Sequence, residues 1–378
     1  MKINFVDLAA QYKNLNLDEL NNLIKMGRFV GGEHLNNFER NLAKYVGVNF
    51  AIGVGSGTDA LWLSLLALGV GRGDEVLVPA NTFIATAFAI SQTGATPIFV
   101  DVHHLTYNID IASSARASTK KTKAIIPVHL YGNPCDMEAI MGFAKLRNLL
   151  VIEDCAQAIG ATFNEKRVGS FGNMAALSFY PTKNLGGLGQ GGVVLTNNEE
   201  LAETVRELGN VGRRRNSWYD YDYLGFNSRL DNLNAWFLNE GLKDLEANNR
   251  RRNEIAIRYN NKLKTCLFVE TPKIAPKSES VYHLYEIRVR DRWFRDALKN
   301  YLNDCGVSTG LHYPIPCHKQ SVYKDFRNID LSVSESLADT LLSLPMHPNL
   351  TEVEIDYVCD CINSFKFKEQ KLQEVKHE

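Results

Sequence analysis

The sequence predicts an α/β protein with a mostly parallel, seven-stranded sheet sandwiched by helices, followed by a smaller C-terminal α+β domain. Between residues 50 and 197, short apolar runs alternate with helical patterns. This alternation is typical of crossover units, which place strands in parallel and cover both faces of a sheet. At 378 residues the chain is longer than one growing core usually supports. We therefore expect a large domain over residues 1–240 and a small domain over 241–378.

The large domain begins with a helical pattern at Phe29 to Gly47, and a second helix, Gly55 to Val70, follows the first strand directly. Two further helical patterns, TFIATAFAISQTG and DMEAIMGFAKLRN, separate later strands. Ligands of such sheets bind at the carboxyl ends of the strands. The expected strands are Ala51 to Val54, Glu75 to Val78, Pro97 to Val100, Ala124 to Val128, Leu150 to Glu153, Ala175 to Phe179 and Val193 to Leu195.

After Asn197 the pattern changes, and a long helix from about Asp231 to Lys264 connects to the small domain. The last dozen residues, rich in Lys and Glu, are expected to be a frayed tail. The elements expected in the small domain are strands near Leu267 to Glu270 and Tyr282 to Val289, a helix at Trp293 to Asp304, a strand leading into LHYPIPCH (311–318), and helices near Ser334 to Ser343 and Glu352 to Phe365.

Composition excludes several classes of protein. Basic and acidic residues number 42 and 43, so the basic excess of nucleic-acid or anionic-membrane proteins is missing. The seven cysteines are scattered without a CxxC pair, which predicts no zinc site, no disulfide framework and a cytoplasmic location. No leader or membrane-spanning pattern is seen. The pair His103-His104 lacks partners for a metal, and the arginine triplets 213–215 and 250–252 are interpreted as solvated faces.

One lysine stands out between two expected strands. Lys183 follows the run Ala175 to Phe179 and precedes five glycines, which allow the backbone to approach a flat ligand closely. A lysine held in this way can form a Schiff base with an aldehyde. The alternative is a surface hairpin in which Lys183 is merely solvated.

Two further groups fall at strand ends. Ser56-Gly57-Thr58 lies where a strand turns into a helix, and the N–H groups of a helix N-terminus can bind phosphate. A plain capping motif is the alternative.

Leu150 to Glu153 leads into Asp154, and because side chains alternate along a strand, only one of Glu153 and Asp154 faces a given site. A carboxylate facing a pyridine nitrogen would keep it protonated. The alternatives for Asp154 are a helix cap or a core salt bridge.

Asn227 and Arg229 offer an amide and a guanidinium for an anion, although such residues often decorate a loop. A phosphate cradle, a strand-end aspartate and a loop lysine together match what pyridoxal phosphate needs. This cofactor requires an anion clamp, a partner for its ring nitrogen and an amine for its aldehyde.

Six motifs in order resemble the sugar aminotransferases of the DegT/DnrJ/EryC1/StrS group, which have the fold type I of pyridoxal-phosphate enzymes. The resemblance spans nearly the whole chain. The motifs are SGTDAL (56–61), PANTFIATA (79–87), VHLYG (128–132), EDCAQAIGA (153–161), SFYPTKNLG (178–186) and GFNSRLD (225–231). Where the group commonly reads LGALGDGG after the lysine, this chain has Gly187 and Gln190 in place of the small residue and the acid.

The resemblance implies a role for individual residues. Lys183 would bind the cofactor aldehyde and then shuttle a proton, Asp154 would pair with the ring nitrogen, Gln157 would reach the ring hydroxyl, and Phe83 would stack on the ring. The residues implied for the cofactor phosphate are Gly57, Thr58 and Ser178, with Asn227 and Arg229 from a second subunit. Those implied for the sugar nucleotide are His312, Tyr313 and Tyr180.

The activity implied is a pyridoxal-phosphate aminotransferase that moves an amino group from glutamate, through the pyridoxamine form of the cofactor, to a dTDP- or UDP-linked keto-6-deoxy sugar. Position C3 is favoured over C4. The product would be a deoxyamino sugar for lipopolysaccharide or S-layer glycan, and the enzyme would be a homodimer with a site shared across the interface. Two alternatives stay open. One is a related dehydratase, although those replace the lysine with histidine. The other is a noncatalytic relative that regulates or scaffolds.

Overall fold

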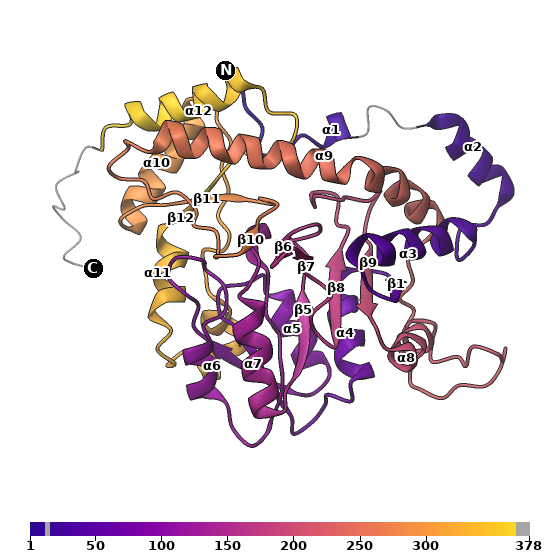
Figure 1. Cartoon of the computed structure of the whole chain (residues 1–378). Helices are drawn as coiled ribbons and strands as arrows, with labels where there is room; N and C mark the ends of the chain where they lie inside the picture. Colours follow the sequence, from indigo (N-terminus) through magenta and orange to yellow (C-terminus); the bar gives the residue numbers. More distant parts are fainter. Residues whose placement is uncertain (12–15, 368–378) are drawn as a thin grey trace, which may run out of the picture.

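The computed structural model describes residues 1–11 and 16–367, and its centre is one seven-stranded sheet (Figure 1). The strand order is β1-β9-β8-β5-β4-β2-β3, which confirms the predicted number of strands. The strands are β1 (Phe50–Val54), β2 (Glu75–Pro79), β3 (Thr96–Val100), β4 (Thr122–Ile125), β5 (Leu150–Asp154), β8 (Met174–Ser178) and β9 (Gly192–Thr196).

β9 is antiparallel to both of its neighbours, β1 and β8, whereas the other pairs are parallel. The loop that joins β8 to β9 returns directly, without a crossover helix, and therefore reverses the chain. The register of β9 places Gly192 opposite both Val54 of β1 and Ser178 of β8. The carboxyl ends of β1 and β8 thus meet at one edge of the sheet, beside the end of β5.

Helices cover both faces, as predicted. Val76 and Val78 of β2 pack in a cluster with α4 and α5, whereas Leu77 between them packs on the opposite side with α7. This alternation is expected for a strand buried on both faces. The helices of this part are α1 (Leu8–Gln11), α2 (Leu17–Met26), α3 (Glu33–Val46), α4 (Gly57–Ala67), α5 (Ala85–Gln92), α6 (Ile111–Ala117), α7 (Met137–Arg147) and α8 (Glu199–Gly209), with a 3-10 turn at Leu130–Gly132.

The long helix α9 (Asn232–Leu263) contains 32 residues and contacts both α3 and α12. In Figure 1 it lies along one side of the molecule and connects the two parts of the chain. The predicted boundary at residues 240 and 241 falls inside α9 and stays a prediction. Among the residues that the structure describes, no helix combines the length and apolar character needed to cross a bilayer.

The C-terminal part has its own apolar core, in which Ile3 from the start of the chain also packs. Its antiparallel pair joins β11 (Tyr285–Arg288) to β12 (Leu341–Leu344). Its helices are α10 (Arg292–Asp304), α11 (Ser332–Thr340) and α12 (Glu352–Ser364), with 3-10 turns at Cys317–Lys319 and Ser321–Phe326. A small sheet elsewhere joins β6 (Thr162–Phe163), β7 (Lys166–Arg167) and β10 (Ser278–Glu279).

Three predictions for the C-terminal part need correction. The helix expected to reach Ser343 ends at Thr340, because the buried run Leu341–Leu344 pairs with β11 instead. The strand expected to lead into residues 311–318 is reduced to a single bridge between Gly310 and Ser343. Near Leu267, only Glu270 pairs with another segment, at Arg288. From residue 368 on, the expected frayed tail lies outside the described residues.

Candidate active site

The N-terminus of α4 forms a cradle at the end of β1. Ser56 caps the helix, since its Oγ accepts a hydrogen bond of 3.0 Å from the N–H of Asp59. Gly57 and Thr58 begin the helix, where N–H groups have no carbonyl partner within the helix. A Cβ at Gly57 would lie 2.7 Å from the Cβ of Ser178. Ser56 therefore fills the capping role, and the first N–H groups of α4 could in addition bind an anion.

Asp154 is the last residue of β5 and is buried. Its Oδ2 accepts a hydrogen bond of 2.8 Å from Oγ1 of Thr86, and its Oδ1 accepts one of 3.1 Å from the N–H of Ala156. Burial raises the pKa of Asp154, against the opposing effects of these two hydrogen bonds and of the nearby charge on Lys183. A cationic nitrogen next to this carboxylate would offset the desolvation cost of its negative charge.

Lys183 lies in the loop between β8 and β9 and is partly buried, so it is not the solvated residue of a surface hairpin. Desolvation lowers the pKa of its amine to about 8, although the Asp154 carboxylate acts in the opposite direction. The side chain of Asn234 on α9 holds the loop by accepting from the N–H of Leu188 at 2.9 Å and donating to the carbonyl of Gln190 at 2.8 Å. A Cβ at Gly187 would lie 2.4 Å from Oδ1 of Asn234, so this close contact favours glycine at position 187.

Gln157 connects the sheet edge to the C-terminal part. Its Oε1 accepts a hydrogen bond of 2.6 Å from the N–H of Tyr131, and its Nε2 donates one of 3.1 Å to the hydroxyl of Tyr313. The ring of Tyr313 lies 5.7 Å from that of Phe83, which is 53% exposed. The Tyr131 hydroxyl donates to the carbonyl of His312. Four residues predicted from three separate segments, Phe83, Gln157, His312 and Tyr313, therefore belong to one contiguous cluster.

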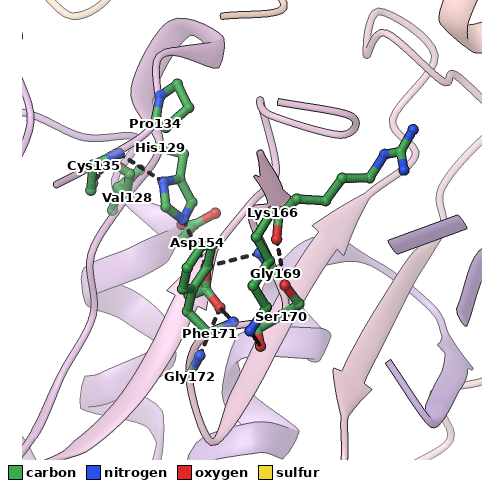
Figure 2. A network of polar contacts seen from close by, with 12 residues as sticks. Val128, His129, Pro134, Cys135, Asp154, Lys166, Gly169, Ser170, Phe171 and Gly172 are labelled. Carbon is green, nitrogen blue, oxygen red and sulfur yellow. Dashed lines mark hydrogen bonds and ion pairs between the residues drawn. The ribbon is translucent and has the colours of Figure 1, made fainter. Parts of the chain in front are cut away.

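Glu153 is buried and belongs to a polar network whose members His129, Gly169, Phe171 and Gly172 are labelled in Figure 2. Its two oxygens accept hydrogen bonds from the N–H groups of Gly169, Phe171 and Gly172 and contact Nε2 of His129 at 3.1 Å. Burial alone would raise the pKa of Glu153, but the hydrogen bonds from His129, Gly169 and Gly172 hold it below its usual value.

His129, Glu153 and Cys155 place possible metal ligands within 4.8 Å of one another. However, Nδ1 of His129 accepts the N–H of Cys135 at 3.0 Å, so its proton is on Nε2 and is donated to Glu153. The lone pairs of His129 and Glu153 that a metal would need are therefore engaged. The network instead joins the 129–135 and 169–172 segments to the end of β5 (Figure 2).

Asn227 and Arg229 are hydrogen-bonded to each other. Arg229 donates to Oδ1 of Asn227 at 2.7 Å and to Oδ1 of Asn210 at 3.1 Å, and both predicted residues are exposed or partly exposed. Ser228 between them bonds to the N–H of Gly55 at 2.9 Å and to Asp59 at 2.8 Å, which attaches this segment to the start of α4. Tyr180, at the start of the lysine loop, is also exposed.

The secondary candidates divide. Arg214 and Arg215 are exposed and pair with Asp222 and Glu203, as expected for a solvated face. The interpretation of triplet 250–252 as solvated is wrong for Arg252, which is buried and donates to the carbonyls of Tyr282 and Met346. The rings of His103 and His104 contact each other in a loop.

Sequence reasoning missed Thr86, His129, Tyr131 and Ser228, which contact the predicted residues. Each lies inside or directly beside a quoted motif, so motif membership was the available signal. Their roles follow from contacts between distant segments, such as that between Thr86 and Asp154.

The residues present fit pyridoxal phosphate. The start of α4 forms an anion cradle closed by Ser178, Asp154 is a buried carboxylate, and Lys183 has an amine of lowered pKa. An α/β sheet with these groups at its strand ends defines a pyridoxal-phosphate enzyme of fold type I.

Comparison with known proteins agrees with this class. A model of the DegT/DnrJ/EryC1/StrS aminotransferase family matches residues 11–363. The chain belongs to this family.

Similar proteins include dTDP-3-amino-3,6-dideoxy-alpha-D-galactopyranose transaminase of Aneurinibacillus thermoaerophilus, 42% identical over 97% of this chain and 100% of that protein. A UDP-N-acetyl-3-dehydro-alpha-D-glucosamine 3-aminotransferase of Acidithiobacillus ferrooxidans is 43% identical over 95% of this chain and 97% of its own length. A solved structure of Streptomyces venezuelae DesV with a ketimine intermediate superposes with a TM-score of 0.92 at 39% identity, over 96% of this chain and 98% of that one.

Bacillus subtilis NtdA with bound cofactor PMP gives a TM-score of 0.90 at 36% identity, over 96% of this chain and 84% of that one. The chain is therefore a nucleotide-sugar aminotransferase that uses pyridoxal phosphate and its pyridoxamine form.

Proposed function

We propose that this enzyme transfers the amino group of glutamate to C3 of a dTDP- or UDP-linked keto-6-deoxy sugar. The observation that carries the proposal is the placement of Lys183 and Asp154 at one sheet edge, close enough for each charge to affect the pKa of the other. An amine of pKa about 8 has a much larger unprotonated fraction near neutral pH than an ordinary lysine, and this fraction can both attack an aldehyde and accept a proton.

In this proposal Gly57, Thr58 and Ser178 bind the cofactor phosphate. Support comes from the helix N-terminus, whose dipole favours an anion, and from the closeness of Gly57 to Ser178. Gln157, held by the N–H of Tyr131, orients its amide toward the ring hydroxyl, and the exposed ring of Phe83 covers one face.

The negative charge of Asp154 would keep the ring nitrogen protonated. Hydrogen bonds from Thr86 and Ala156 fix the orientation of this carboxylate. When bound, pyridoxal phosphate supplies an aldehyde that carries the amino group and a ring that withdraws electrons. Lys183 removes and returns the proton at the substrate carbon. Burial keeps its amine poised for this exchange near physiological pH.

His312, Tyr313 and Tyr180 form the substrate side of the site. Tyr313 is anchored by Gln157, and His312 by Tyr131, so both have defined positions without a ligand. Exposed Tyr180 lies next to the lysine loop, where an incoming sugar nucleotide would pass.

The enzyme acts as a homodimer in this proposal, and Asn227 with Arg229 completes the phosphate site of the second subunit. Their exposure, together with exposed Trp218 and Tyr219 on the preceding segment, supports this arrangement. Light scattering should give twice the mass of one chain, and a monomer that retains full activity would contradict the shared site.

Position C3 is supported by the two relatives described above, whose names specify a 3-amino or 3-dehydro sugar. The test is to supply glutamate with a panel of dTDP- and UDP-linked 3-keto and 4-keto sugars and to locate the new C–N bond by NMR. We expect amination at C3. Amination at C4 alone would overturn the position, and amination of none would overturn the substrate class.

Two other activities are disfavoured. A dehydratase of this group would carry histidine in place of Lys183. A relative 41% identical over 97% of this chain is named pleiotropic regulatory protein, from Geobacillus stearothermophilus. The visible absorbance of a noncatalytic regulator with bound cofactor would not change when glutamate is added. This enzyme, in contrast, should lose its yellow absorbance as the pyridoxamine form accumulates.

A further inference from the structure

A buried carboxyl group in the C-terminal part connects to His312 through one hydroxyl. Oγ of Ser343 lies 2.6 Å from Nδ1 of His312 and is also hydrogen-bonded to Oε1 of Glu286. Nδ1 and Oε1 are 3.8 Å apart, so Ser343 is the direct connection between them. Glu286 and Ser343 are essentially inaccessible to solvent, whereas the His312 side chain is 25% exposed.

The sheet holds these three groups in place. Glu286 and Ser343 are opposite each other in the register of β11 and β12. The N–H of Ser343 donates to the carbonyl of Gly310 at 3.0 Å and its carbonyl accepts from the N–H of Gly310 at 3.1 Å, which attaches the segment that carries His312 to the edge of β12. Phe5 stacks on the imidazole with ring centroids 5.7 Å apart. The imidazole orientation is thus fixed from the buried side.

The protonation of this chain of groups follows from burial. Desolvation raises the pKa of Glu286 to about 8, against the opposing effect of its hydrogen bond with Ser343. Desolvation, together with the charge on Lys183, lowers the pKa of His312 to about 4. At neutral pH the carboxyl group is therefore mainly protonated, and the imidazole carries a single proton.

The position of the carboxyl proton decides the direction of the hydrogen bonds. Oε2 of Glu286 is buried, and no described residue is hydrogen-bonded to it. A proton on Oε2 would be a buried donor without a protein partner, whereas a bare carbonyl-type oxygen is better tolerated. The proton is thus placed on Oε1, which donates to Oγ of Ser343. The Ser343 hydroxyl then donates to Nδ1 of His312, and the imidazole proton must lie on Nε2.

We propose that Glu286 and Ser343 are positioning residues that fix His312 as the Nε2–H tautomer, so that the ring offers a hydrogen-bond donor to an acceptor oxygen of the bound nucleotide sugar. Nε2 is the ring nitrogen left for a ligand, because Nδ1 is engaged and no described residue bonds to Nε2. The identity of the ligand rests on the proposed function, but the tautomer does not.

The tautomer can be measured directly in the holoenzyme labelled with nitrogen-15 histidine. The signals of His312 are identified by their loss in the His312→Asn variant. At pH 7 we expect Nε2 to be protonated and Nδ1 to be bare, with the pattern kept in Glu286→Gln, whose amide can still donate to Ser343. A protonated Nδ1 in the wild-type enzyme would overturn the proposal.

The consequence for substrate is tested by separating the two half-reactions. Glu286→Leu and Ser343→Ala remove the fixed donor and should raise KM for the nucleotide sugar about tenfold, the effect of one lost hydrogen bond. The rate of bleaching by glutamate should change little in both variants, and Glu286→Gln should keep the KM of the wild-type enzyme.

An unchanged KM in both Leu and Ala variants would overturn the donor role, as would a Gln variant that behaves like Leu. If even the wild-type enzyme fails to bleach with glutamate, the proposed function fails, while the nitrogen-15 measurement still decides the tautomer.

Discussion

Thr86 on α5 donates a hydrogen bond of 2.8 Å to Asp154 at the end of β5, and so fixes the one strand-end carboxylate that shares its environment with Lys183. Asp154→Asn should preserve these contacts while removing the negative charge. We expect kcat to fall about 100-fold or more, since the ring nitrogen then loses its proton. Steady-state kinetics at saturating cofactor tests this. Thr86→Val, which keeps the charge, should lose less than about tenfold, and an Asn variant as active as the wild type would contradict the role.

Gly57 approaches Ser178 too closely for any side chain. In Gly57→Ala the new Cβ would lie 2.7 Å from Cβ of Ser178 and would displace the start of α4 from the phosphate site. We expect the Kd for pyridoxal phosphate to rise about tenfold or more, measured by absorbance titration of the apoenzyme. Gly142→Ala is the matched control, because a Cβ there meets nothing within 4 Å. Equal Kd values in both variants would count against the cradle.

The reactivity of the Lys183 amine should rise at a lower pH than that of an ordinary lysine. Only the unprotonated amine attacks an aldehyde, so the rate of covalent cofactor attachment should rise with pH. Because burial lowers the pKa of Lys183 to about 8, the midpoint should lie near pH 8. Stopped-flow absorbance of apoenzyme mixed with pyridoxal phosphate gives this profile. A midpoint near 10.5, the usual value for lysine, would mean that the amine is not desolvated.

Glu153 should contribute to stability rather than to chemistry. Glu153→Gln replaces an acceptor of several hydrogen bonds by an amide that must face N–H donors, so we expect a loss of about 3 kcal/mol of unfolding free energy. The folded pKa of Glu153 lies below its unfolded value. Its contribution is therefore complete above the unfolded pKa and disappears as pH falls through the folded pKa.

Denaturant unfolding of both proteins from pH 7 downward checks this dependence. The difference between them should be constant near neutrality and shrink below about pH 4. Glu138→Gln, which removes an exposed pair with Lys277, should barely alter the midpoint. A Glu153→Gln protein as stable as the wild type would show that the network in Figure 2 does not hold the end of β5.

Periodicity predicted the seven strands, the helices between them and the long helix α9, because each carries a strong local pattern. It failed at Leu341–Leu344, since a short buried apolar run does not distinguish a strand from the end of a helix. Alternation indicated only that one of Glu153 and Asp154 faces the site, and the family resemblance supplied the choice of Asp154. The fold decides between them by surrounding Glu153 with backbone donors.

Within the site, Lys183, Asp154 and the start of α4 were predictable because each combines a residue type with a strand end or a loop. Glu286, Ser343 and Thr86 were not, because their roles depend on contacts that only the folded chain creates. Asn227 and Arg229 illustrate the converse: the motif is plain, but within this one chain the two residues bond to each other and to Asn210 rather than to the lysine cluster.

The account depends most on the amine of Lys183 as the attachment point of the cofactor. Reduction of the holoenzyme with borohydride, followed by proteolysis and mass spectrometry, locates that bond. We predict one pyridoxyl adduct, on the peptide that contains Lys183, and none in the Lys183→Ala protein, which should bind cofactor noncovalently without turnover. An adduct on a different lysine, or full turnover by Lys183→Ala, would contradict the account.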